Sequence, residues 1–126
     1  MIQKFVMSYD INIVDKNGEV IYVDEPHGIA GGTYSPDSTE LWLNITFNYG
    51  KIFSREDVFG TGGIKNLIGM TVKDALPVVT KAVSVLKDDY DDDYWAATEG
   101  NAKRSLINLI KILNLAPADG IIAIGY

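Results

Sequence analysis

Core-forming and polar residues alternate between positions 41 and 49, and this is the clearest pattern in the chain. The alternation predicts a β-strand, because successive side chains of a strand point to opposite faces of the sheet. One face would carry Leu41, Leu43, Ile45, Phe47 and Tyr49, and the other Trp42, Asn44, Thr46 and Asn48. The first face suits a hydrophobic core. The second combines an aromatic ring, two amides and a hydroxyl, which are groups suited to a polar ligand.

A β-hairpin is predicted before this strand. Residues 8–15 alternate, and a turn containing Gly18 separates them from the β-prone run 20–23. Residues 24–40 are rich in Gly and Pro and predict a long loop, and loops of this length are often functional.

The length of the turn decides the register of the hairpin. A two-residue turn would pair Ile13 with Tyr22, whereas a three-residue turn with its glycine left-handed would pair Ile13 with Ile21 and Ile11 with Val23. We favour the second register, because it gives one continuous apolar face.

Two long helices are predicted in the second half of the chain. In the first, apolar residues follow the helical period over 75–86. If Thr71 is its N-cap, Pro77 lies deep and should kink the helix, whereas with Asp74 as the cap Pro77 falls in the tolerated first turn. The second helix has Thr98 as its N-cap, runs to about Leu115, and carries Arg104 and Asn108 on its outward face.

Shorter elements complete the predicted fold. Ser54 resembles the N-cap of a short helix, residues 64–68 suit one helical turn that ends at Gly69, and residues 120–124 suit a buried final strand. Together these patterns predict a single α+β domain. Its antiparallel sheet contains the N-terminal hairpin and strand 41–49, with the C-terminal run as a candidate further strand, and it packs against two long helices.

Composition narrows the class of protein. A chain of 126 residues with 47% hydrophobic content suits one domain over residues 1–126. Its 17 acidic and 11 basic residues give a net charge of −6, which disfavours direct binding to nucleic acid or to an anionic membrane. The absence of cysteine excludes disulfides, thiolate metal sites and a cysteine nucleophile, and it favours a cytosolic location.

The first apolar run is too short for a signal peptide or a membrane span. Either Met1 or Met7 then serves as the initiator, and residues 1–7 are an extended or non-native start. We expect a cytoplasmic protein.

The polar face of strand 41–49 is the leading candidate for a ligand site. In this hypothesis Trp42 stacks on the ligand, Asn44 and Asn48 bind its polar edges beside Thr46, and the loop from His27 to Tyr34 closes over it. The alternative is a half-exposed strand whose polar residues simply face water.

The region before the second long helix supplies two further candidates. Trp95 either anchors the helix to the core or lines a pocket. Asn101 lies in the first turn of that helix, where free backbone N–H groups and the adjacent Gly100 suit an anion. An ordinary capped helix is the alternative, and Glu99 competes for the same positive end.

No catalytic residue, metal site or cofactor is assigned. The acidic run 88–93 offers carboxylates for Ca²⁺ but lacks the EF-hand spacing, so a solvated linker is favoured. His27 beside Glu25 could act as a general acid or base, yet no second residue supports that chemistry.

Several blocks of the sequence carry a family resemblance over residues 8–120. They are Tyr9-Asp10-Ile11, Glu25-Pro26-His27, Gly31-Gly32-Thr33-Tyr34, the segment 42–49, Asp93-Tyr94-Trp95 and Thr98-Glu99-Gly100-Asn101-Ala102-Lys103. In these blocks the chain resembles a family of small proteins of unknown function that recur in phages and prophage-bearing bacterial genomes. The resemblance implies no activity, but it implies a setting in which such proteins act on host machinery or host defence. If the protein is phage-encoded, the expected location is the host cytoplasm.

Three functional hypotheses follow. The first is a non-catalytic cytosolic binding protein that holds a small polar, nucleotide-like ligand. The second is an acidic inhibitor of a host nucleic-acid-binding or defence protein, with residues 88–93 presenting the charge. The third is a small hydrolase or transferase that uses His27. The expected partner is a small ligand or a host protein, and homo-oligomer formation is left open.

Overall fold

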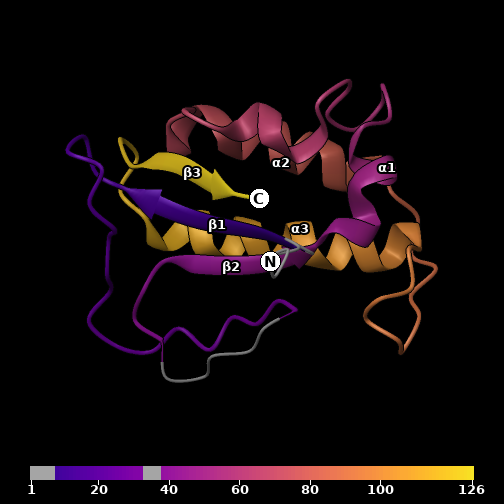
Figure 1. Cartoon of the computed structure of the whole chain (residues 1–126), viewed down its shortest axis with the longest axis horizontal. Helices are drawn as coiled ribbons and strands as arrows, with labels where there is room; N and C mark the ends of the chain where they lie inside the picture. The colour runs from indigo at the N-terminus through magenta and orange to yellow at the C-terminus, as the bar shows by residue number, and fades with distance from the viewer. Residues whose placement is uncertain (1–7, 33–37) are drawn as a thin grey trace, which may run out of the picture.

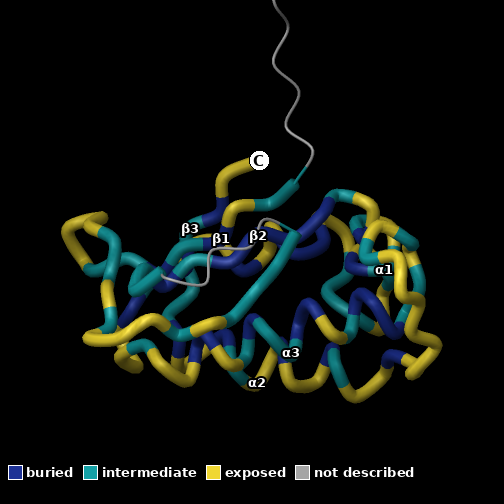
Figure 2. Tube along the Cα trace, turned by 90° about the horizontal axis from the view of Figure 1, so that it is seen from below, coloured by how far each residue is buried: buried dark blue, intermediate teal, exposed yellow. Residues whose placement is uncertain are grey.

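The computed structural model describes residues 8–32 and 38–126. Its antiparallel sheet has the strand order β2-β1-β3, formed by β1 (Ser8–Val14), β2 (Trp42–Thr46) and β3 (Ile121–Gly125). Two helices, α2 (Val72–Ser84) and α3 (Glu99–Leu115), lie against one face of this sheet (Figures 1 and 2). The shorter elements are η1 (Phe47–Tyr49), α1 (Gly50–Phe53) and η2 (Gly63–Leu67). The predicted α+β class is confirmed.

β1 is the central strand, and its alternation separates the core from the outer face of the sheet. Ile11 pairs with Leu43 of β2 and with Ile124 of β3. These side chains point toward the helices and are buried. Asp10 and Asn12 alternate with the inward-facing residues of β1, so these polar residues lie on the outer face of the sheet, on the opposite side from the helices.

The predicted hairpin forms only next to its turn. Val14 bridges to Val20, which is the register of the three-residue turn, and Gly18 has the expected left-handed φ of 80°. The predicted pairing of Ile11 with Val23 is wrong, because β2 and β3 occupy both edges of β1 at that position. Residues 20–23 therefore make isolated bridges instead of a strand of the sheet.

β2 ends earlier than the alternation predicts. The Thr46 side chain accepts a hydrogen bond from the backbone N–H of Asn48 at 3.2 Å, and this cap begins the 3-10 turn η1. The prediction of a strand through residue 49 is therefore wrong, although Tyr49 is buried as expected. Gly50 begins α1, and Ser54 caps the C-terminal end of that helix instead of the N-terminus of another.

The N-terminus of α2 resolves the alternative that the sequence left open. The Thr71 side chain accepts a hydrogen bond from the backbone N–H of Asp74 at 3.2 Å, so Thr71 is the N-cap. Pro77 consequently lies inside the helix. Because proline has no N–H, the carbonyl of Lys73 loses its usual helical donor.

The remaining elements agree with the sequence. The Thr98 side chain accepts a hydrogen bond from the Asn101 N–H at 3.0 Å, and α3 ends at Leu115 as predicted. The final run forms β3, and the predicted turn over 64–68 corresponds to η2.

A single hydrophobic core joins the sheet to the helices. Its fully buried members include Ile11, Ile13, Leu41, Leu43, Ile45, Tyr49, Phe53, Val79, Leu106, Leu109 and Ile112. Within the described ranges, no helix combines the length and apolar character needed to cross a bilayer.

Candidate functional site

The predicted polar face of β2 lies on the outer face of the sheet, where residues of β1 extend it. Asn12 is the cross-strand neighbour of Trp42, and Asp10 is that of Asn44. Trp42 is partly exposed. The Oδ1 atom of Asn12 is buried and has no hydrogen-bond partner among the described residues. Asp10 and Asn12 thus extend the predicted polar face, although the sequence of strand 41–49 alone did not indicate them.

The Asn44 side chain is used inside the protein. Its Nδ2 donates to Ser8 Oγ at 2.7 Å and to Asp10 Oδ1 at 2.8 Å, and only 5% of the residue is exposed. Its backbone carbonyl accepts a hydrogen bond from Gly32 N–H at 3.0 Å. Both N–H donors of the Asn44 side chain are therefore used within the protein. This differs from the hypothesis that Asn44 binds the polar edge of a ligand.

Thr46 and Asn48 are also engaged locally. Thr46 is 1% exposed and caps η1, and its backbone N–H donates to the Tyr94 hydroxyl at 3.1 Å. Asn48 is exposed and donates from Nδ2 to the Trp95 carbonyl at 2.8 Å. These contacts join the end of β2 to the segment before α3.

His27 fixes the loop instead of presenting a free base. Its Nδ1 accepts a hydrogen bond from Ile29 N–H at 3.0 Å, and its Nε2 lies 2.7 Å from the Glu40 carbonyl. Nδ1 thus acts as an acceptor, and Nε2 faces a carbonyl oxygen to which a ring N–H can donate. Both ring nitrogens are occupied, so this geometry gives no support to the hydrolase hypothesis. Tyr34, the other aromatic of the predicted closing loop, lies outside the described residues.

Asn101 holds the acidic segment 88–93 against α3. Its Oδ1 accepts from Asp91 N–H at 3.0 Å, and its Nδ2 donates to the carbonyls of Asp93 and Ala96 at 2.9 and 3.1 Å. The residue is 3% exposed. Asn101 thus has a structural role that its position in a helix cap did not reveal.

The N-terminus of α3 already has an anionic partner within the chain. Asp89 Oδ1 accepts a hydrogen bond from Gly100 N–H at 2.7 Å. A Cβ on Gly100 would lie 2.6 Å from the backbone nitrogen of Tyr90, so glycine permits this close approach. The glycine that suggested an external anion instead accommodates the acidic segment.

Trp95 lies at the surface beside the acidic segment. It is 51% exposed, and its ring packs edge-on against Tyr94 with centroids 4.9 Å apart. Tyr94, its neighbour in sequence, is the residue that turns inward. Among the described residues, no cluster of three or more His, Cys, Asp or Glu side chains could hold a metal ion.

A cavity of about 240 Å³ lies between the edge of β2, the backbone at residues 30–31 and one side of α3. We call it the β2–α3 cavity. It is lined by Ala30, Gly31, Leu43, Ile45, Tyr49, Tyr94, Asn101, Arg104, Ser105 and Asn108. β2 contributes the apolar side chains Leu43 and Ile45, η1 and the segment before α3 contribute Tyr49 and Tyr94, and α3 contributes polar groups and one cation.

The loop at residues 30–31 forms one wall of the β2–α3 cavity, and the neighbouring Gly32 also packs against β2. A Cβ on Gly31 would lie 1.8 Å from the Asn44 carbonyl oxygen, so only glycine fits this contact. A Cβ on Gly32 would lie 2.8 Å from Asn44 Oδ1. From the other side, Asn108 Nδ2 donates to the Ala30 carbonyl at 3.0 Å. The loop is therefore attached to both β2 and α3.

The aromatic wall is neutral, and the helical wall is positive. Burial raises the pKa of Tyr49, the nearby Tyr94 raises it further, and the positive charge of Arg104 acts in the opposite direction. Burial also raises the pKa of Tyr94. Tyr49 donates its hydroxyl proton to the Tyr94 carbonyl. Arg104 stacks over the exposed Tyr90 ring at 4.6 Å and donates no hydrogen bond to another described residue.

Sequence reasoning identified Asn101 and the Gly-rich loop but missed most of the cavity. Helical periodicity assigned Arg104 and Asn108 to the outward face of α3. That assignment is correct for a helix against a sheet, but the loop at residues 30–31 covers the same side of α3. The signal that could have indicated this was the adjacent pair Gly31-Gly32, which is typical of close backbone contact.

No family model matches the chain, and neither a curated protein nor a solved structure shows significant similarity to it. A functional proposal therefore rests on the geometry of the described residues and not on similarity to a known protein.

Proposed function

We propose that the protein is a non-catalytic binding protein for a small anionic ligand with a flat ring, held in the β2–α3 cavity. The single observation that carries this proposal is the composition of the cavity: an apolar and aromatic wall faces Arg104, and no acidic residue lines it. Ligand sites typically combine such a surface with a few polar groups that orient the ligand.

The polar groups of α3 have capacity left for a ligand. Arg104 can donate two parallel hydrogen bonds to a carboxylate or phosphate. Asn108 uses Nδ2 to hold Ala30, which leaves its Oδ1 as an acceptor for a ring N–H. Ser105 donates to the Ala102 carbonyl at 2.6 Å and can still accept.

The size of the cavity restricts the ligand. A volume of about 240 Å³ is below the range of roughly 300–1,000 Å³ typical of drug-sized ligands. A single ring with an anionic group, or the base of a nucleotide with its phosphate outside, is compatible with that space. This refines the ligand class, and it moves the proposed site from the outer face of the sheet to the opposite side of β2.

The direct test compares binding of nucleoside monophosphates and monocyclic aromatic carboxylates to the wild type and to Arg104→Gln. We expect thermal stabilisation by at least one probe and about a tenfold weaker affinity in the variant, because a charge-assisted bidentate contact is lost. Lys111→Gln is the matched control, since it removes one positive charge from an exposed position of the same helix. Equal binding by both variants, or no binding of any probe to the wild type, would refute the proposal.

A second function is favoured by the order of the acidic segment. Asp91 Oδ1 accepts from Asp93 N–H at 2.8 Å, and Asp93 Oδ1 accepts from Trp95 N–H at 3.0 Å. Residues 88–93 are thus held in place beside the exposed Trp95 ring. Such a surface would suit a basic host protein in the cytoplasm, as expected for an acidic inhibitor of phage type.

Salt distinguishes the two functions. Capture of a basic protein by the acidic segment should weaken steeply as ionic strength rises, because exposed charges are screened. Binding inside the β2–α3 cavity should change much less, because the aromatic wall provides part of the affinity. The double variant Asp91→Asn with Asp92→Asn should weaken capture of a basic protein but leave binding in the β2–α3 cavity unchanged.

A further inference from the structure

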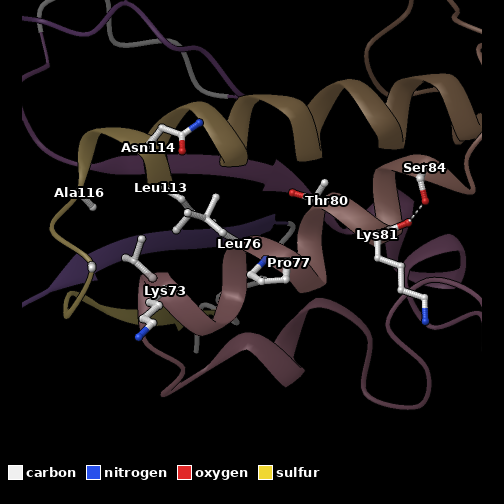
Figure 3. A pocket seen from close by; sticks show the side chains of 11 residues that line it. Lys73, Leu76, Pro77, Thr80, Lys81, Ser84, Leu113, Asn114 and Ala116 are labelled. Carbon is white, nitrogen blue, oxygen red and sulfur yellow. Dashed lines mark hydrogen bonds between the residues drawn. The ribbon is translucent and has the colours of Figure 1, made fainter.

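A second cavity lies between α2 and the C-terminal end of α3, and it shares no lining residue with the β2–α3 cavity. We call it the α2–α3 groove. Its volume is about 700 Å³, and it is lined by Val72, Lys73, Leu76, Pro77, Thr80, Lys81, Ser84, Leu113, Asn114, Ala116 and Ala118. Figure 3 shows Leu76, Pro77 and Leu113 between Lys73 at one end and Lys81 at the other.

The centre of the groove is apolar. Leu76 is partly exposed and Pro77 is exposed on the surface of α2, whereas Leu113 is buried beneath them. Ala116 and Ala118 continue the apolar surface past the end of α3. Burial of this surface would favour association, because removing apolar area from water lowers the free energy in proportion to the area buried.

The ends of the groove are positive, although the chain carries a net charge of −6. Lys73 and Lys81 both line it, and no acidic residue does. Within the described residues neither lysine takes part in an ion pair. They are eight residues apart on α2, which corresponds to about 12 Å along the helix axis at about 1.5 Å per residue.

Unused hydrogen-bonding groups lie along the same groove. The side chains of Thr80 and Asn114 form no hydrogen bond with another described residue, whereas Ser84 Oγ donates to the Lys81 carbonyl at 2.6 Å. The Lys73 carbonyl also lacks its usual helical donor, because Pro77 has no N–H. Polar groups beside an apolar centre are typical of a protein interface rather than of an acyl-chain site.

We propose that the α2–α3 groove binds an amphipathic helix of a partner protein, with acidic side chains about two turns apart on either side of its apolar face. The apolar face would lie over Leu76, Pro77 and Leu113, and the acids would pair with Lys73 and Lys81. This is the recognition mode in which a helix lies in a hydrophobic groove.

A second copy of this chain does not supply such a helix from its described residues. The only acidic residue of α2 is Asp74, and the only one of α3 is Glu99. The third described α-helix, α1, has none. The charge pattern therefore favours a different protein over self-association.

A selection experiment tests the charge pattern directly. A library of helical peptides would keep leucine at positions i, i+3, i+4 and i+7 and would vary two flanking positions, two turns apart, among Glu, Ser and Lys. The wild type should enrich Glu at both positions. Lys73→Glu with Lys81→Glu should enrich Lys, and the control Lys87→Glu with Lys111→Glu, which has the same net charge, should still enrich Glu.

The second measurement determines where the selected peptide binds and how tightly. Amide chemical shifts should change at Lys73, Leu76, Thr80 and Asn114 on addition of the selected Glu peptide. Replacing its two Glu residues by Lys should weaken binding about tenfold, since each exposed ion pair contributes modestly. Leu76→Asp should abolish binding while thermal unfolding confirms that the variant folds.

Each contrary outcome is distinct. Enrichment of Lys by the wild type, or no enrichment, would overturn the proposal. So would binding of decanoate in the groove without any peptide binding, because the occupant would then be an alkyl carboxylate. Sedimentation that shows self-association lost in Leu76→Asp would identify the occupant as a second copy.

Discussion

The hydroxyl of Tyr94 accepts a hydrogen bond from the backbone N–H of Thr46 at 3.1 Å. Tyr94 precedes α3, whereas Thr46 ends β2, so this bond satisfies a donor at the outer edge of the strand. Two residues earlier the Asn44 carbonyl, an acceptor, receives a hydrogen bond from the Gly32 N–H. Both contacts protect the edge of β2, which would otherwise offer unpaired backbone groups to another chain. Tyr94, which makes the first of these contacts, also lines the β2–α3 cavity.

Asn101 should be essential for the stability of the segment before α3. Asn101→Ala leaves the Asp93 and Ala96 carbonyls and the Asp91 N–H without their partner, so we expect a loss of about 3 kcal/mol in the free energy of unfolding. Urea denaturation measures this loss. The matched control is Asn114→Ala on the exposed surface of the same helix, which should change stability by less than about 0.5 kcal/mol. Similar losses in the two variants would contradict the assigned role.

Gly31 should tolerate no side chain. The Cβ of Gly31→Ala would overlap the Asn44 carbonyl, so the loop must move away from β2, at a cost of about 1–3 kcal/mol in stability. Ligand binding in the β2–α3 cavity should fall with it, because this backbone forms a wall. In the control Gly125→Ala the nearest atom is 3.9 Å away, and both stability and binding should be retained. Hydrogen exchange of the Gly32 amide would report the broken contact.

Tyr49 should make unfolding depend on alkaline pH. Its folded-state pKa is raised by burial, so the stability it contributes is complete below its unfolded pKa of about 10 and is lost as pH rises above that value. Tyr49→Phe should cost about 1–2 kcal/mol at neutral pH, because the Tyr94 carbonyl loses its donor.

The difference between the wild type and Tyr49→Phe should therefore shrink above pH about 10, where only the wild type loses the contribution of Tyr49. Chemical denaturation at several pH values measures this trend. Tyr22→Phe serves as the comparison, since Tyr22 is 65% exposed. A difference that stays constant with pH would show that Tyr49 does not carry the effect.

Two asparagines on the outer face of the sheet should respond in opposite directions to the same substitution. Asn12→Val removes a buried oxygen that has no described partner and adds a residue that favours strands, so we expect about 1 kcal/mol of stabilisation. Asn44→Val removes two hydrogen bonds and should destabilise by about 2 kcal/mol. Thermal unfolding of both variants is the measurement. Destabilisation by Asn12→Val would mean that its oxygen has a partner after all.

The parts of the fold that depend on short-range sequence signals were predictable. Thr98 caps α3 because a threonine before a periodic apolar run satisfies free N–H groups, and the left-handed Gly18 follows from the register of its turn. The parts where two local structures compete for the same residues were not predictable. The alternation through Tyr49 is compatible with a strand, but the hydroxyl of Thr46 caps a turn first.

The candidate site was only partly predictable for the same physical reason. The polar character of Asn44 and Asn101 is evident in the sequence, but whether their hydrogen bonds are used internally depends on residues far along the chain. The Asn44 side chain is hydrogen-bonded to Asp10, and the Asn101 side chain is hydrogen-bonded to the acidic segment. The cavity arises because the loop at residues 30–31 rests on Asn108, a contact that no local pattern contains.

The central position of β1 has a consequence for how the chain folds. Asp10 pairs with Asn44 on one side and with Gly125 on the other, so the central strand is synthesised well before one of its two neighbours, β3. Such distant pairing lowers folding rates, because long loops must close before the contacts form. During synthesis, β1 can therefore be paired on one side only until β3 emerges, and until then its other edge offers unpaired backbone groups to other chains.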